Sequence, residues 1–91
     1  MKKYCYVLSI GSLSKIDDKF HFYDIEVFTS KKKVEKSIKN RIEINKGSDV
    51  VYEDGLTGLT SLESWLVTYN CLNTDGKEMR VRYVVRQTVL K

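Results

Sequence analysis

Side chains that could do acid–base or nucleophilic chemistry are few in this sequence, and they form no familiar motif. His21 is the single histidine, and no Ser-His-Asp or Cys-His arrangement can be built around it. The carboxylate pairs Asp17/Asp18 and Glu53/Asp54 lie in predicted turns, where acidic residues are ordinary. We therefore expect that the protein is not an enzyme, and that His21 is a surface or hydrogen-bonded side chain.

Metal and cofactor chemistry is not indicated either. The two cysteines, Cys5 and Cys71, lie far apart in strand-like segments, and with one histidine they cannot complete a zinc site without carboxylates. Both thiols are expected to be buried as small apolar groups and not joined as a disulfide. The segment from Gly55 to Gly58 lacks the Gly-Lys-Ser/Thr ending of a phosphate loop. The sequence thus predicts no metal and no cofactor.

The pattern of apolar residues and turn signals predicts one α+β domain spanning residues 1–91. A chain of 91 residues is one domain by length. Strands are expected at 3–10, 20–29, 49–53, 63–72 and 77–90, and a helix at 31–46. The order is ββαβββ, which favours a mainly antiparallel five-stranded sheet with one amphipathic helix packed on one face.

The helix carries the clearest periodicity in the chain. Ser30 is a favoured N-cap residue, and Gly47 is expected at the C′ position. Val34, Ile38 and Ile42 recur at intervals of four and predict a buried stripe, which Ile44 is expected to widen.

The positive charge is concentrated on this helix. Residues 31–46 hold seven Lys and Arg against two Glu, a net of +5, so the rest of the chain sums to −1. Three lysines occupy the first turn, where the helix dipole disfavours cations. One interpretation is a solvated face; the other is an electrostatic or nucleic-acid contact. The residues of that contact would be Lys31, Lys32, Lys33, Lys36 and Lys39.

A single helix cannot cover the expected sheet. A helix is about 10 Å wide and strands lie about 4.8 Å apart, so it covers roughly half of one face. If Tyr23, Ile25 and Val27 face the helix, the opposite face is open and polar. Thr68 and Asn70 are expected there, together with the candidate open-face residues Phe22, Asp24, Glu26, Arg80, Arg82 and Arg86. Those acids could simply pair with the arginines across strands, or the face could bind a partner or a second copy.

Location is predicted from what precedes the first strand. Met1, Lys2 and Lys3 are followed by a strand-like segment and not by the apolar core of a secretory signal. No apolar run approaches the roughly 18 residues of a spanning helix. We expect a cytoplasmic protein without membrane contact.

Three functions remain open. The first is a non-catalytic protein-binding module, either a homodimer or an inhibitor or accessory protein acting on a larger complex. In overall style the chain is similar to short lysine-rich accessory proteins of phages and mobile elements, and this resemblance implies such a blocking role. The second is nucleic-acid binding through the lysine-rich helix. The third is a small-ligand site between the sheet and residues 54–62.

Overall fold

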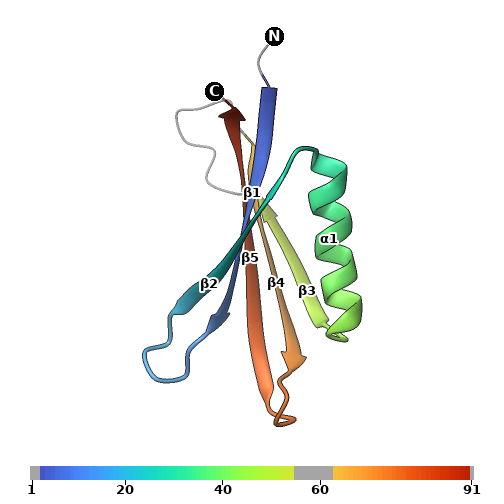
Figure 1. Cartoon of the computed structure of the whole chain (residues 1–91). Coiled ribbons are helices and arrows are strands. Elements are labelled where there is room, and N and C mark those ends of the chain that lie inside the picture. Colours follow the sequence, from blue (N-terminus) through green and yellow to red (C-terminus); the bar gives the residue numbers. More distant parts are fainter. Residues whose placement is uncertain (1–2, 55–62, 91) are drawn as a thin grey trace.

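The computed structural model describes residues 3–54 and 63–90, and it confirms the predicted α+β fold. Five antiparallel strands form one sheet, and one helix packs against it (Figure 1). Two strands precede the helix and three follow it, as predicted. The elements are β1 (Lys3–Leu13), β2 (Phe20–Phe28), α1 (Lys31–Ile44), β3 (Ser48–Asp54), β4 (Ser64–Leu72) and β5 (Glu78–Leu90).

The strands are arranged in the order β2-β1-β5-β4-β3, so β5 is central and β2 and β3 are the edges. Lys3 pairs with Leu90, which sets the beginning of β1 beside the end of β5 at the top of Figure 1. Because side chains alternate along a strand and paired residues share a face, the register assigns every regular strand residue to one of two faces.

The core lies between α1 and the sheet. Leu8, Val67 and Val85 come from adjacent strands and are fully buried beneath the helix. Val34 and Ile38 are the buried residues of α1. Most of the stability of a chain this short comes from burying such large apolar side chains.

Both ends of α1 are fixed to its surroundings by polar contacts. Ser30 caps the helix as predicted, because its hydroxyl accepts a hydrogen bond from the Lys33 amide. At the first turn, the Lys31 ammonium lies 3.0 Å from a Glu63 carboxylate oxygen and 5.5 Å from the centre of the Trp65 ring. At the last turn, Asn45 donates a hydrogen bond to the Tyr69 hydroxyl.

The helix ends differently from the prediction. Its C-cap is Asn45, and the left-handed residue that follows is Lys46, with φ of 52°. The Gly47 amide bonds to the Ile42 carbonyl and the Lys46 amide bonds to that of Glu43, which is a Schellman motif with Gly47 at C″. Glycine is needed there for space, because a Cβ would lie 2.6 Å from the Tyr69 ring. The expectation that Ile44 widens the buried stripe is also wrong, since Ile44 is 78% exposed.

This ending predicts opposite effects for two adjacent substitutions. Gly47→Ala is expected to lower the free energy of unfolding by about 1–2 kcal/mol, because the new methyl group overlaps the Tyr69 ring. Lys46→Gly is expected to raise it by about 0.5–1 kcal/mol, because glycine adopts positive φ without penalty. Urea unfolding of both variants measures these changes. If the free energy of unfolding changes in the same direction in both variants, the assignment of Lys46 to C′ and Gly47 to C″ is contradicted.

Two tyrosine hydroxyls form the polar part of the buried core. Tyr69 and Tyr83 share a hydrogen bond between their hydroxyls, and their rings pack edge to face with their centres 5.5 Å apart. Burial raises the pKa of Tyr83 strongly, and the hydrogen bond to Tyr69 adds to the effect. The folded protein therefore holds this proton more tightly than the unfolded chain does.

A pH dependence of stability follows from that shift. Below about pH 10 the Tyr83 hydroxyl is protonated in both states, but above it only the unfolded chain releases the proton. The free energy of unfolding should therefore decrease as pH rises beyond about 10. Unfolding of the wild type and of Tyr83→Phe across that range checks this. The variant should lose stability less steeply with pH, and identical slopes would contradict it.

Candidate functional site

The face of the sheet opposite α1 is covered by no described element, and we call it the open face. The register fixes which side chains it carries from each strand. The residues on it are Cys5, Val7, Ser9, Gly11, Leu13, Phe20, Phe22, Ile25, Val27, Ser48, Val51, Glu53, Ser64, Leu66, Thr68, Asn70, Leu72, Glu78, Arg80, Arg82, Val84, Arg86 and Thr88.

Arginines occupy the centre of the open face. Arg80, Arg82 and Arg86 project from β5, the central strand, and we call them the arginine row. Arg82 lies with its guanidinium carbon 4.0 Å from the centre of the Phe20 ring, and its Nε donates a hydrogen bond to Thr68. Arg80 and Arg86 are exposed. The row is therefore cationic, central to the sheet and accessible.

Four of the six open-face residues predicted from sequence lie on this face, and two do not. Phe22 and the arginine row are on the open face. Asp24 and Glu26 pair with Ile10 and Leu8, whose side chains are buried on the helix side, so their predicted placement is wrong.

Asp24 and Glu26 lie on the helix side because α1 places a cationic side chain there. Arg41 lies on the sheet-facing side of α1 and forms an ion pair with Glu26. This pair requires a carboxylate on the helix side of β2, which turns Ile25 and Val27 to the opposite face. Tyr23, the third residue expected under the helix, lies where the β1–β2 register shifts and is 66% exposed.

Ile25 and Val27 are thus open-face residues that sequence reasoning missed. They are 64% and 63% exposed, which is unusual for adjacent apolar positions of a strand. The signal that could have located them is Arg41, which follows Val34 by seven residues and Ile38 by three and so shares the apolar side of the helix.

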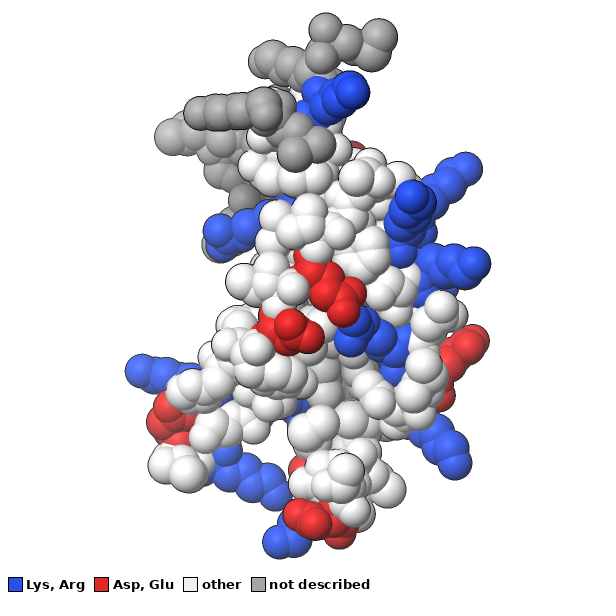
Figure 2. All heavy atoms as spheres, in the orientation of Figure 1, with Lys and Arg blue, Asp and Glu red and all other residues white. Residues whose placement is uncertain are grey.

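The helix lysines form a second cationic surface on the other side of the molecule. Lys and Arg side chains gather on the right of Figure 2, where Figure 1 places α1. Lys31 contacts Glu63, whereas the described residues provide no acidic ion-pair partner for Lys32, Lys33, Lys36 or Lys39. Helical spacing brings the side chains at positions 32, 36 and 39 together on the outward side of α1. We call these three lysines the lysine stripe.

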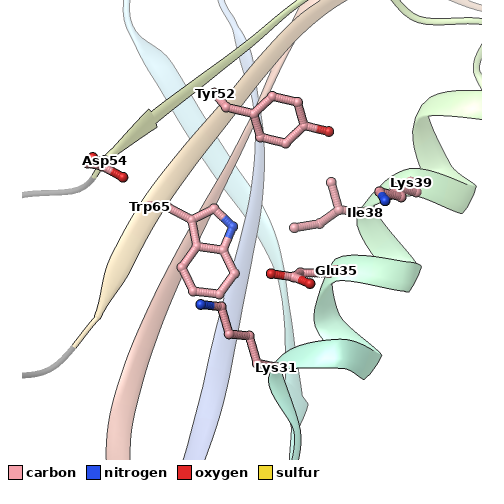
Figure 3. Close-up of a pocket in the computed structure, with 7 residues that line it drawn as sticks. All are labelled: Lys31, Glu35, Ile38, Lys39, Tyr52, Asp54 and Trp65. Carbon is pink, nitrogen blue, oxygen red and sulfur yellow. The ribbon is translucent and has the colours of Figure 1, made fainter.

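A groove of about 380 Å³ separates α1 from the β3–β4 side of the sheet. Trp65 and Tyr52 project from the sheet toward the helix, and Lys31, Glu35 and Ile38 project toward them (Figure 3). Its charged groups are mixed in sign, and Lys31 is already bound to Glu63. The predicted ligand site involving residues 54–62 falls almost wholly outside the described residues.

The candidate chemical groups are dispersed. His21 hydrogen-bonds to Asp17 at 2.7 Å on an exposed turn, and this contact lowers the pKa of the Asp17 carboxyl. Cys5 and Cys71 are buried free thiols, as predicted, and burial raises the pKa of Cys71. Across residues 3–54 and 63–90, no three His, Cys, Asp or Glu side chains are grouped to hold a metal ion.

The described part of the chain contains no helix long and apolar enough to cross a membrane. Comparison of the sequence and structure with protein-family models, curated proteins and solved structures finds no match to any of them.

Proposed function

We propose that the protein is a non-catalytic binding module that holds another protein against its open face. The observation that supports this most directly is the combination of exposed apolar side chains with the central arginine row. Ile25, Val27 and Phe22 are 64%, 63% and 46% exposed on the same face. Exposed apolar surface of this kind marks interaction sites.

The composition of the open face supports a protein partner. Arginine and aromatic residues are enriched at protein interfaces, and buried charged anchors there carry much of the binding energy. Leu66 and Val84 are half-buried between the strands and add apolar surface beside the arginines. A protein surface can supply apolar contacts and hydrogen-bond acceptors together. We further propose the cytoplasm as the place of action, in the manner of an accessory or inhibitor protein of phage or mobile-element type.

Site-specific photo-crosslinking in the producing cells tests this function. Benzoylphenylalanine at Ile25 would sit on the open face, and the same group at Asn40 would sit on the exposed outer side of α1. We expect a discrete heavier adduct from position 25 that position 40 does not give, with its second chain identified by mass spectrometry. Adduct formation at neither position 25 nor position 27 would contradict the proposal.

Self-association is the simplest alternative to a different partner. Size-exclusion chromatography with light scattering separates them, because a partner of another kind leaves the purified protein monomeric at high concentration. A crosslinked adduct containing two copies of this chain would assign the open face to a dimer.

A second candidate function is nucleic-acid binding, and the observation that favours it is the lysine stripe, which forms no ion pair with the described residues. Lysines on one helix face release counterions when they contact phosphates, so affinity falls steeply with salt. The double variant Lys32→Glu/Lys36→Glu tests this, with Arg80→Glu/Arg86→Glu as its matched control. Each changes the net charge from +4 to 0, the first on the outward side of α1 and the second on the open face.

Fluorescence anisotropy with duplex and single-stranded DNA at about 50 mM salt gives the readout. If the stripe binds phosphates, the lysine variant should lose affinity and its log–log salt slope should fall by about 2. The arginine variant should then bind as the wild type does. Absence of wild-type binding at this salt concentration, or equal losses in both variants, would rule out the lysine stripe as a nucleic-acid site.

A further inference from the structure

We infer that the partner of the open face is an acidic polypeptide segment, in which carboxylates lie among apolar side chains. This inference rests on the proposed function and adds the chemistry of the partner. The arginine row would bind the carboxylates, and the aliphatic side chains on either side of it would bind the apolar residues.

The arginine row is prepared for anions by its own contacts. The Nε of Arg82 donates to Thr68 and the Nε of Arg80 donates to Asn70 at 3.2 Å. Stacking on Phe20 further fixes the Arg82 guanidinium. An arginine held through Nε keeps its terminal amino groups available, and planar guanidinium groups pair well with carboxylates. Less side-chain entropy is then lost on binding.

The charges of the open face would complement a partner surface that is acidic at its centre and less acidic at its edges. The arginines lie in the middle of the sheet, whereas Glu53 lies on edge strand β3 and Glu78 begins β5. No described carboxylate lies within ion-pair distance of Arg80, Arg82 or Arg86. A desolvated, unpaired arginine costs free energy, so a partner that covers this row must bring acceptors.

The apolar neighbours of the row distinguish between classes of partner. Single-stranded nucleic acids bind through aromatic platforms and phosphate contacts. Here the Phe20 ring is covered by Arg82, and Phe22 is the one exposed aromatic side chain on the edge strands of the described open face. The other exposed apolar side chains on these edge strands, β2 and β3, are aliphatic: Ile25, Val27 and Val51. Phosphate backbones leave such aliphatic groups uncovered, whereas alternating acidic and apolar residues of a polypeptide match both features.

A second copy of this chain fits the row less well. A symmetric pair brings the same patch of each copy together. If it is centred on β5, arginines would face arginines, and like charges that face each other in an interface disfavour binding. The occupant favoured by charge is therefore a different, acidic chain.

Selection from a random-peptide library displayed on phage tests the inference with the intact protein as bait. Arg80→Glu/Arg86→Glu serves as the counter-selection bait, and Lys32→Glu/Lys36→Glu is the matched control with the same change of charge. We expect selected peptides rich in Asp or Glu together with Leu, Ile, Val or Phe. Synthetic copies should bind the wild type and the lysine variant alike, and the arginine variant about tenfold more weakly or worse. Circular dichroism and thermal unfolding confirm that both variants fold.

Each other outcome has a defined meaning. Peptides that map to the open face by NMR but carry neutral or basic residues overturn the acidic partner and leave the proposed function standing. Failure to select any peptide that depends on the open face, with no open-face crosslink in cells, overturns both. Binding of a thymidine oligonucleotide that is lost in the arginine variant, or dimers formed through the open face, would also overturn the inference.

Discussion

Ile38→Ala is expected to lower the free energy of unfolding by about 2–4 kcal/mol. Ile38 is 2% exposed and is one of two fully buried side chains that join α1 to the sheet. Truncating it leaves a cavity in the buried cluster between α1 and the sheet, and the hydrogen-bonded strands on one side of that cavity cannot move in to fill it. For a chain of this length, the melting temperature should fall by about 10 °C or more.

The same helix supplies the matched control. Ile44→Ala removes the same atoms from a side chain that is 78% exposed, so it should change stability by about 0.5 kcal/mol or less. Urea unfolding of both variants at 25 °C gives the comparison. Similar losses at positions 38 and 44 would mean that α1 is not anchored as described.

Gly11→Ala is expected to be the second most damaging substitution, at about 2–3 kcal/mol. A Cβ at this position would lie 2.7 Å from the backbone carbonyl oxygen of His21 and equally close to the Phe22 ring. Backbone atoms cannot rotate away as a side chain can, so β1 and β2 would have to separate. Hydrogen exchange should then accelerate mainly in β2, because that strand is an edge.

Gly76→Ala separates this steric cost from the cost of backbone conformation. Gly76 has φ of 76° and no atom within 4 Å of a Cβ. Its substitution should cost about 1 kcal/mol through the left-handed backbone alone. Chemical denaturation of both variants is the measurement. A loss at Gly11 no larger than that at Gly76 would show that the β1–β2 contact can relax.

The sequence was a sufficient guide to the fold because its signals were local and consistent. Ser30, the repeat Val34-Ile38-Ile42 and the alternation along β5 each indicate one element, and the structure has each of them. The helix ending was harder, because Gly47 was expected to relieve backbone strain. It is actually required because the Tyr69 ring, twenty-two residues later, occupies the space of a side chain.

The open face was only partly predictable for a related reason. Alternation along β2 shows that Ile25 and Val27 share a face, but not which face. That choice depends on Glu26 pairing with Arg41, a contact between residues on different elements. The arginine row was located correctly because β5 is central and its apolar residues Val81, Tyr83 and Val85 must be buried.

The pairing of β1 with β5 has a consequence for how the chain folds. These two strands are adjacent in the middle of the sheet but far apart in the sequence, with Lys3 opposite Leu90. During synthesis at roughly 5–20 residues per second, β1 must wait for β5 to leave the ribosome before the centre of the sheet can close. Closing so long a loop is slow. We therefore expect that the nascent chain reaches its native form only after β5 has emerged, and that a ribosome-stalled chain lacking β5 is readily degraded by proteases.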